Sequence, residues 1–212
     1  MPRILPRYDK TLQREVDSAL GIVRAGEIVR LQGGVLGRQE WTDLRLEALY
    51  ELAYLRVFSA WEACLESIMI RSMCGYTTAA GQRATMTNGK CYTKIIDAET
   101  AILGGQQYKL WHNPQHVVTR CRQFMVGSLQ EMTISSNIAR IEGMAAVRHR
   151  IVHDQGDAKR KFDSSSLLFA ARTFPRSRPG KFLRHWDSAS NPKVRWIESL
   201  ANELIQMASQ MV

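Results

Sequence analysis

The spacing of hydrophobic and polar residues predicts that the chain is built mainly from helices. Apolar side chains recur every three or four positions, which is the period of a helix that buries one face. The long segments with this period are residues 9–32, 43–74, 136–153 and 193–211. We find no alternating pattern typical of strands, no repeat and no βαβ arrangement, so the sequence predicts an all-α fold.

Shorter signals divide the chain between these helices. Gly33-Gly34 is expected to stop the first helix. Residues 75–113 look irregular apart from a short helix over 94–103. Asn113-Pro114 resembles a cap followed by proline at the first helical position, which predicts a further helix to about Met125.

Two further expectations concern the region around the helix over 136–153. Ser135 or Ser136 is expected to cap this helix, and Gly156 is expected to end its course. Residues 154–192 are polar, basic and rich in Ser, Pro and Arg, so we predict a long basic loop before the last helix. The expected division is an N-terminal helix and linker over 1–42 and a helical-bundle domain over 43–212.

The positive charge is concentrated in one part of the chain. The net charge is +9, and residues 148–195 hold twelve basic against four acidic side chains, which accounts for +8 of it. A concentrated basic segment attracts polyanions because its cations replace the counterions of phosphates. A solvated surface without a partner explains the charge equally well.

Composition gives expectations about the location of the protein. The sequence has no apolar run long enough for a membrane span, and its four cysteines are scattered without close pairing. These features predict a soluble cytoplasmic protein with reduced thiols. His149 and His153 have a spacing found in metal sites, but no third ligand suggests itself, so no metal is expected.

One residue does not fit the pattern of its predicted helix. Ile138, Ile141, Ala145 and Val152 fall on one stripe, and Arg148 falls in the middle of it. A buried guanidinium needs an anionic partner, so Arg148 is expected either to pair with Glu62 or Glu66 or to face a shared cleft. His153 would point about 140° away from Arg148 on a continuous helix, so convergence needs a frayed helix end or a second copy of the chain.

Residues 146–154 carry a resemblance to a known family. The string Ala-Val-Arg-His-Arg-Ile-Val-His-Asp resembles the signature of HEPN-domain proteins, in which four to six residues separate an arginine from a histidine and a polar residue follows the arginine. The run 55–66 is similar to the long early helix of the RiboL-PSP and abortive-infection branches. The resemblance covers residues 43–211 and implies a compact HEPN-like helical bundle with the motif at the end of a late helix.

This resemblance also implies a function. It implies a metal-independent endoribonuclease without a cofactor, active as a homodimer with a composite active site. It further implies a role as a toxin or antiviral defence effector, with a cognate antitoxin or defence partner. Some members bind RNA or nucleotides without cutting. Where other branches carry a modifiable tyrosine two residues after the motif histidine, this chain has Gln155.

The residue types suit this chemistry. RNA supplies its own nucleophile, the 2′-hydroxyl, and cleavage to a 2′,3′-cyclic phosphate and a 5′-hydroxyl needs proton transfer and stabilisation of a charged phosphate. Histidine suits the proton transfer, so His153 is the expected general acid or base, with His149 as a second proton carrier or phosphate contact. Arg148 is expected to hold the scissile phosphate. The side chains expected to guide the RNA backbone are Arg150, Lys159, Arg160 and Lys161.

Two other classes of function stay open at this point. One is a non-catalytic RNA- or nucleotide-binding module that uses the same basic surface. The other is an antitoxin or scaffold subunit whose helices mainly contact proteins. Trp186 lies beside Arg184 and His185, a position that suits stacking on a base.

Overall fold

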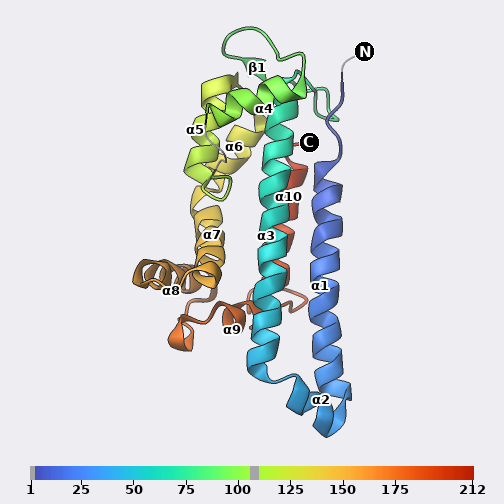
Figure 1. The fold of residues 1–212 in the computed structure, drawn as a ribbon, viewed down its shortest axis with the longest axis vertical. Helices are drawn as coiled ribbons and strands as arrows, with labels where there is room; N and C mark the ends of the chain where they lie inside the picture. The colour runs from blue at the N-terminus through green and yellow to red at the C-terminus, as the bar shows by residue number, and fades with distance from the viewer. Residues whose placement is uncertain (1–2, 106–109) are drawn as a thin grey trace. The chain divides into compact units, whose positions relative to one another are not determined.

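The computed structural model describes residues 3–105 and 110–212, and within them it confirms the all-α prediction (Figure 1). Residues 106–109, which belong to the segment expected to be irregular, lie outside the described residues. The helices are α1 (Tyr8–Gln32), α2 (Gly34–Glu40), α3 (Asp43–Met73), α4 (Ile95–Leu103), α5 (Pro114–Phe124), α6 (Leu129–Ser136), α7 (Ile138–Val152), α8 (Gly156–Ala170), the 3-10 turn η1 (Pro175–Ser177), α9 (Pro179–Arg184) and α10 (Trp196–Ser209). Two short strands, β1 (Thr85–Met86) and β2 (Met125–Val126), pair antiparallel.

The contacts between residues divide the chain into two compact units. Unit 1 contains the described residues up to 12 and those of 61–142 and 204–212, and unit 2 contains residues 13–60 and 143–203. The chain passes from one unit to the other inside α1, α3, α7 and α10. The expected boundary between residues 42 and 43 is not one of these passages.

Unit 1 is organised around capped helices and the small sheet. The Asn113 side chain accepts hydrogen bonds from the backbone N–H groups of Gln115 and His116, which confirms the predicted start of α5. Ser128 caps α6 in the same way by accepting from Glu131 N. Gln130 is buried and donates to the carbonyl of Leu65, 2.8 Å away, which joins α6 to α3.

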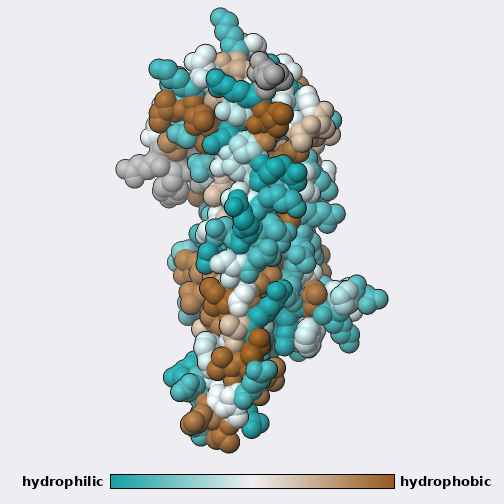
Figure 2. All heavy atoms as spheres, turned by 90° about the vertical axis from the view of Figure 1, so that its right-hand side faces the viewer, coloured by the Kyte–Doolittle hydropathy of each residue, from teal (hydrophilic) through white to brown (hydrophobic). Residues whose placement is uncertain are grey.

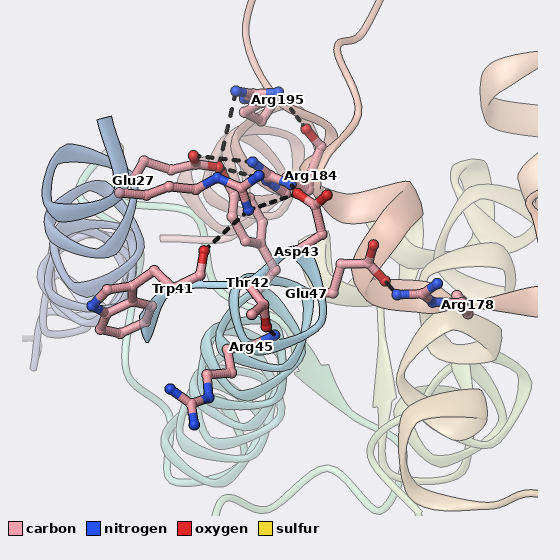
Figure 3. A network of polar contacts seen from close by, with 11 residues as sticks. Glu27, Trp41, Thr42, Asp43, Arg45, Glu47, Arg178, Arg184 and Arg195 are labelled. Atoms are coloured by element: carbon pink, nitrogen blue, oxygen red, sulfur yellow. Dashed lines mark hydrogen bonds and ion pairs between the residues drawn. The ribbon is translucent and has the colours of Figure 1, made fainter. Parts of the chain in front are cut away.

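Unit 2 begins with an antiparallel helix pair, α1 and the first half of α3, joined through α2. Three polar contacts follow the length of this pair: Arg56 to Glu15, Tyr50 to Glu27, and Arg30 to Asp43. Figure 3 shows that Arg184 of α9 inserts its guanidinium between Glu27 and Asp43. This network fixes the C-terminal part of unit 2 against the helix pair.

The close approach of α9 to α3 depends on a glycine. A Cβ atom at Gly180 would collide with the backbone carbonyl of Glu47, and the Gly180 N–H donates to the Glu51 carboxylate at 2.8 Å. Arg178, at the start of α9, forms an ion pair with Glu47 (Figure 3). The small residue thus lets the two backbones meet with their polar groups satisfied.

The prediction of a long loop over 154–192 is wrong. Its first half forms α8, whose buried residues Ala158, Phe162, Ser165 and Phe169 follow a helical spacing of four, three and four. Gly156 begins this helix and does not merely end the previous one. The prediction failed because Ser165 and Ser166 are buried although their side chains are polar, so the buried face of α8 does not show as an apolar stripe in the sequence.

The structure corrects three smaller predictions. Gly33-Gly34 ends α1 as expected, but the chain resumes a helix in α2. Helix α6 was not predicted, and Ser135 and Ser136 lie at its end and do not cap α7. The last helix begins at Trp196, three residues later than predicted.

Unit 2 also leaves large apolar side chains exposed along α1, α2 and the start of α3. Figure 2 shows hydrophobic residues at the surface over α1 and α2, among polar ones. The most exposed of them are Leu31, Val35, Leu36 and Leu44.

Candidate active site

The C-terminal half of α7 carries the predicted motif and is firmly fixed within unit 2. Met144 and Val147 are fully buried, and Tyr54 of α3 donates a hydrogen bond to the Met144 carbonyl at 3.0 Å. Gly143 allows Phe169 of α8 to pack against the helix backbone, because a Cβ there would overlap the ring. The motif therefore follows a rigid, well-packed turn.

Arg148 does not lie in the middle of a buried stripe, contrary to the prediction. The buried face of α7 contains Met144 and Val147, whereas Val152 is 49% exposed. Arg148 lies at the margin of this face and is half-buried. The error came from assigning Ala145 and Val152 to the core, since small or terminal apolar residues of a helix are often left outside it.

Arg148 is available to bind an anion. It forms no hydrogen bond and no ion pair with any residue of 3–105 or 110–212. Glu62, one of its two expected partners, instead lies 3.5 Å from Nδ1 of His112 within unit 1. The guanidinium is therefore not neutralised by the carboxylates that the sequence suggested.

His149 and His153 lie next to each other. Their ring centroids are 4.5 Å apart, with an angle of 45° between the ring planes. The backbone N–H of His153 still donates to the carbonyl of His149 at 2.9 Å, so the helical turn continues through His153. The expected fraying that would swing His153 toward Arg148 does not occur. The helical spacing of four brings the two histidines together instead.

The surroundings of His149 lower the pKa of its imidazole. Partial burial is the largest cause, and the nearby His153, Lys161 and Arg148 add to it because positive neighbours disfavour a second positive charge. Asp157 acts in the opposite direction but is outweighed. The lowered pKa favours the neutral imidazole, which is the form that can accept a proton.

The first turns of α8 contribute the charged groups beside the histidines. Lys161 Nζ lies 2.8 Å from the Asp157 carboxylate, one helical turn earlier, and Arg160 lies 3.2 Å from the same group. Asp157 and its pairing were missed because this segment was predicted as a loop. The spacing of four between Asp157 and Lys161 is the signal that would have revealed it.

The four predicted RNA-guiding cations have different surroundings. Lys159, Arg160 and Lys161 are exposed on α8. The Arg150 side chain is only 15% exposed, and its guanidinium pairs with Asp154 and donates to the carbonyls of Ser177 and His153. Arg150 thus joins the end of α7 to η1, which favours a structural role over an RNA contact.

The described part of the chain shows neither a metal-ligand cluster nor a membrane-spanning helix. In residues 3–105 and 110–212, no three His, Cys, Asp or Glu side chains gather in a way that could hold a metal ion. Every helix in these ranges is too short or too polar to cross a lipid bilayer.

Comparison with models of known protein families, with curated proteins and with solved structures gave no match. The resemblance of residues 146–154 to the HEPN signature therefore stays a prediction that rests on the motif and its position at the end of α7.

Proposed function

We propose that the protein is an endoribonuclease that cleaves RNA through its own 2′-hydroxyl, without a metal ion, as the HEPN resemblance implies. The observation that carries this proposal is that each chain places two neighbouring imidazoles, His149 and His153, next to Arg148, which forms no ion pair within residues 3–105 and 110–212. Two imidazoles can move the two protons that RNA cleavage requires, and a free guanidinium can bind the phosphate. The same chemistry leaves DNA intact because DNA lacks the nucleophile.

The proton transfers can be assigned from the electrostatics. His149 is the group with the lowered pKa, so its neutral ring removes the proton from the 2′-hydroxyl. The 2′-oxygen then bonds to phosphorus and the bond to the 5′-oxygen breaks, while His153 in its protonated form supplies the proton to that leaving oxygen. Arg148 holds the phosphate oxygens as their negative charge increases.

The geometry favours a site shared by two copies of the chain. In-line displacement puts the attacking and leaving oxygens on opposite sides of phosphorus, so the base and the acid must approach from opposite sides. The rings of His149 and His153 within one chain are in contact and reach the same side. We therefore propose that one protomer supplies the base and a second protomer supplies the acid.

A complementation experiment tests this sharing. His149→Ala and His153→Ala chains, each inactive alone, are refolded together and assayed on RNA. Mixed dimers retain one intact His149–His153 pair across the interface, so we expect recovery of about one quarter of wild-type activity. A mixture as inactive as its components would show that each chain works alone, or that the mechanism needs both pairs.

A pH experiment tests the role of His149. Because the pKa of His149 is lowered, its acid limb in the pH profile of kcat/KM lies below the ordinary histidine value of about 6.5. Lys161→Met removes one of the nearby cations, so we expect this limb and the NMR titration of the His149 ring to move to higher pH by a few tenths.

Lys159→Met is the matched control, since Lys159 is also an exposed lysine of α8 but is not among the groups that act on His149. It should leave both curves unchanged. If the acid limb of the kcat/KM profile of Lys161→Met lay at the wild-type position or at lower pH, the assignment of His149 as the base would be contradicted.

The resemblance also suggests the biological setting of this activity. A toxin or defence ribonuclease halts growth when it is expressed without its antitoxin. Growth arrest that requires Arg148 and His153 would support this setting. RNA binding without cleavage or arrest would favour the non-catalytic module.

A further inference from the structure

The turn between α9 and α10 displays a tryptophan on a firmly held frame. Backbone hydrogen bonds join Asp187 N to the Val194 carbonyl and Trp196 N to the His185 carbonyl, both at 2.9 Å. The buried Asp187 carboxylate accepts from Ala189 N and from the Ser199 hydroxyl. These contacts fix the backbone on both sides of Trp186.

Trp186 is exposed although its orientation is fixed. The residue is 47% exposed, and the Arg195 guanidinium carbon lies 3.8 Å from the centre of its ring. Arg195 is itself held by a 2.7 Å hydrogen bond to the Arg184 carbonyl and lies 4.0 Å from Glu27 (Figure 3). A cation therefore supports the ring from one side, and the orientation of the exposed ring is already fixed before a ligand binds.

Most charged side chains of this stretch are positive, although Arg195 has acidic neighbours in Glu27 and in Glu198, whose carboxylate accepts from the Arg195 N–H at 3.0 Å. Arg172 lies 3.4 Å from Nε2 of His185, and the other ring nitrogen of His185 lies 2.9 Å from the Trp186 carbonyl. Asp187 is the only acidic residue in 164–197, and it is buried. Arg172, Arg176, Lys181 and Lys193 of the same stretch are exposed. A ligand of this surface must combine a flat aromatic face with negative charge.

We propose that Trp186 is a stacking platform for an unpaired RNA base, with Arg172 contacting a neighbouring phosphate. This proposal deepens the proposed function and rests on it, because it makes single-stranded RNA the substrate class. Unpaired bases expose their faces, whereas those of a duplex are covered by their neighbours. An acidic peptide would satisfy the cations but would leave the ring unused.

The test separates binding from cleavage. A fluorescent, unstructured 2′-O-methyl oligonucleotide of about 12 nucleotides is titrated with the full-length protein, since the methylated sugar cannot be cut. Trp186→Ala should weaken binding about tenfold or more, and Trp186→Phe should keep most of the affinity. Leu168→Ala is the matched control, because it removes another exposed apolar side chain of unit 2 and should have no effect.

Two further measurements separate the contributions of the ring and the cations. Arg172→Ala should reduce the slope of log affinity against log salt by about 0.7, whereas Trp186→Ala should leave the slope unchanged. An abasic oligonucleotide should bind equally to the wild type and to Trp186→Ala.

Binding by Trp186→Ala within twofold of the wild type would overturn the proposal. The proposal would also be overturned if Trp186→Ala weakened binding of the abasic strand as much as that of the intact strand. An equal loss of affinity for a polyglutamate peptide would overturn it as well. Because no strand is cut in these assays, the outcome is independent of whether the protein is a nuclease.

Discussion

Replacing Arg148 or His153 by alanine is expected to reduce RNA cleavage by about 100-fold or more, with little loss of stability. Neither side chain is in the core: Arg148 is half-buried without an ion pair to a described residue, and His153 is exposed. Their removal therefore leaves the packing of α7 intact but removes phosphate binding or proton transfer. Single-turnover rates on a labelled RNA, together with urea unfolding of each variant, measure both effects.

Two control variants sharpen this prediction. Arg148→Lys keeps the charge but loses the two parallel hydrogen bonds to phosphate, so it should recover only part of the rate. Arg38→Ala removes an exposed arginine of α2, which lies outside the motif and the basic segment, and it should change the rate less than threefold. If Arg38→Ala were as damaging as Arg148→Ala, general positive charge and not the motif would explain the activity.

The largest effect on stability is expected from Phe182→Ala, at about 3–5 kcal/mol. Phe182 in α9 is 0% exposed, and its ring centroid lies 5.5 Å from those of Phe174 and Trp196 and 6.0 Å from those of Phe162 and Phe169. Truncation would leave a cavity where α8, α9 and α10 meet. The free energy of unfolding, measured by circular dichroism in urea, checks the value.

The Phe182→Ala experiment also tests whether residues 154–192 are packed into the fold or form the loop that the sequence predicted. Lys181→Ala, at the neighbouring exposed position of α9, should change the free energy of unfolding by less than about 0.5 kcal/mol. A loss below about 1 kcal/mol for Phe182→Ala would mean that residues 156–184 contribute little to the core, contrary to the structure.

Periodic apolar segments were sufficient to predict most of the helices. The helices around Leu46, Val117 and Leu200 each bury one continuous stripe, so their positions could be predicted from spacing alone. Helix α8 could not, because Ser165 and Ser166 occupy buried positions that read as polar. Its Ser166 hydroxyl donates to the Asp163 carbonyl inside the helix, which makes burial possible.

The sequence indicates candidate residues for the site but not how they lie relative to one another. Arg148, His149 and His153 could be selected from the motif, and the contact between the histidines follows from their spacing of four. The roles of Lys161 and Asp157 depend on α8 folding back beside α7, and the confinement of Arg150 depends on Ser177 of η1. These are contacts between separate segments, which the local pattern of one segment does not contain.

The most direct test of the central claim is a comparison of three labelled strands incubated with the wild-type protein in EDTA. One strand is RNA, the second is the same RNA with 2′-deoxy nucleotides at the cleaved positions, and the third is DNA. The account predicts that only the RNA is cut, at positions lost in the second strand, and that the products carry a 2′,3′-cyclic phosphate and a 5′-hydroxyl. Cleavage of DNA or of the deoxy-substituted positions, a requirement for added metal, or intact RNA would contradict it.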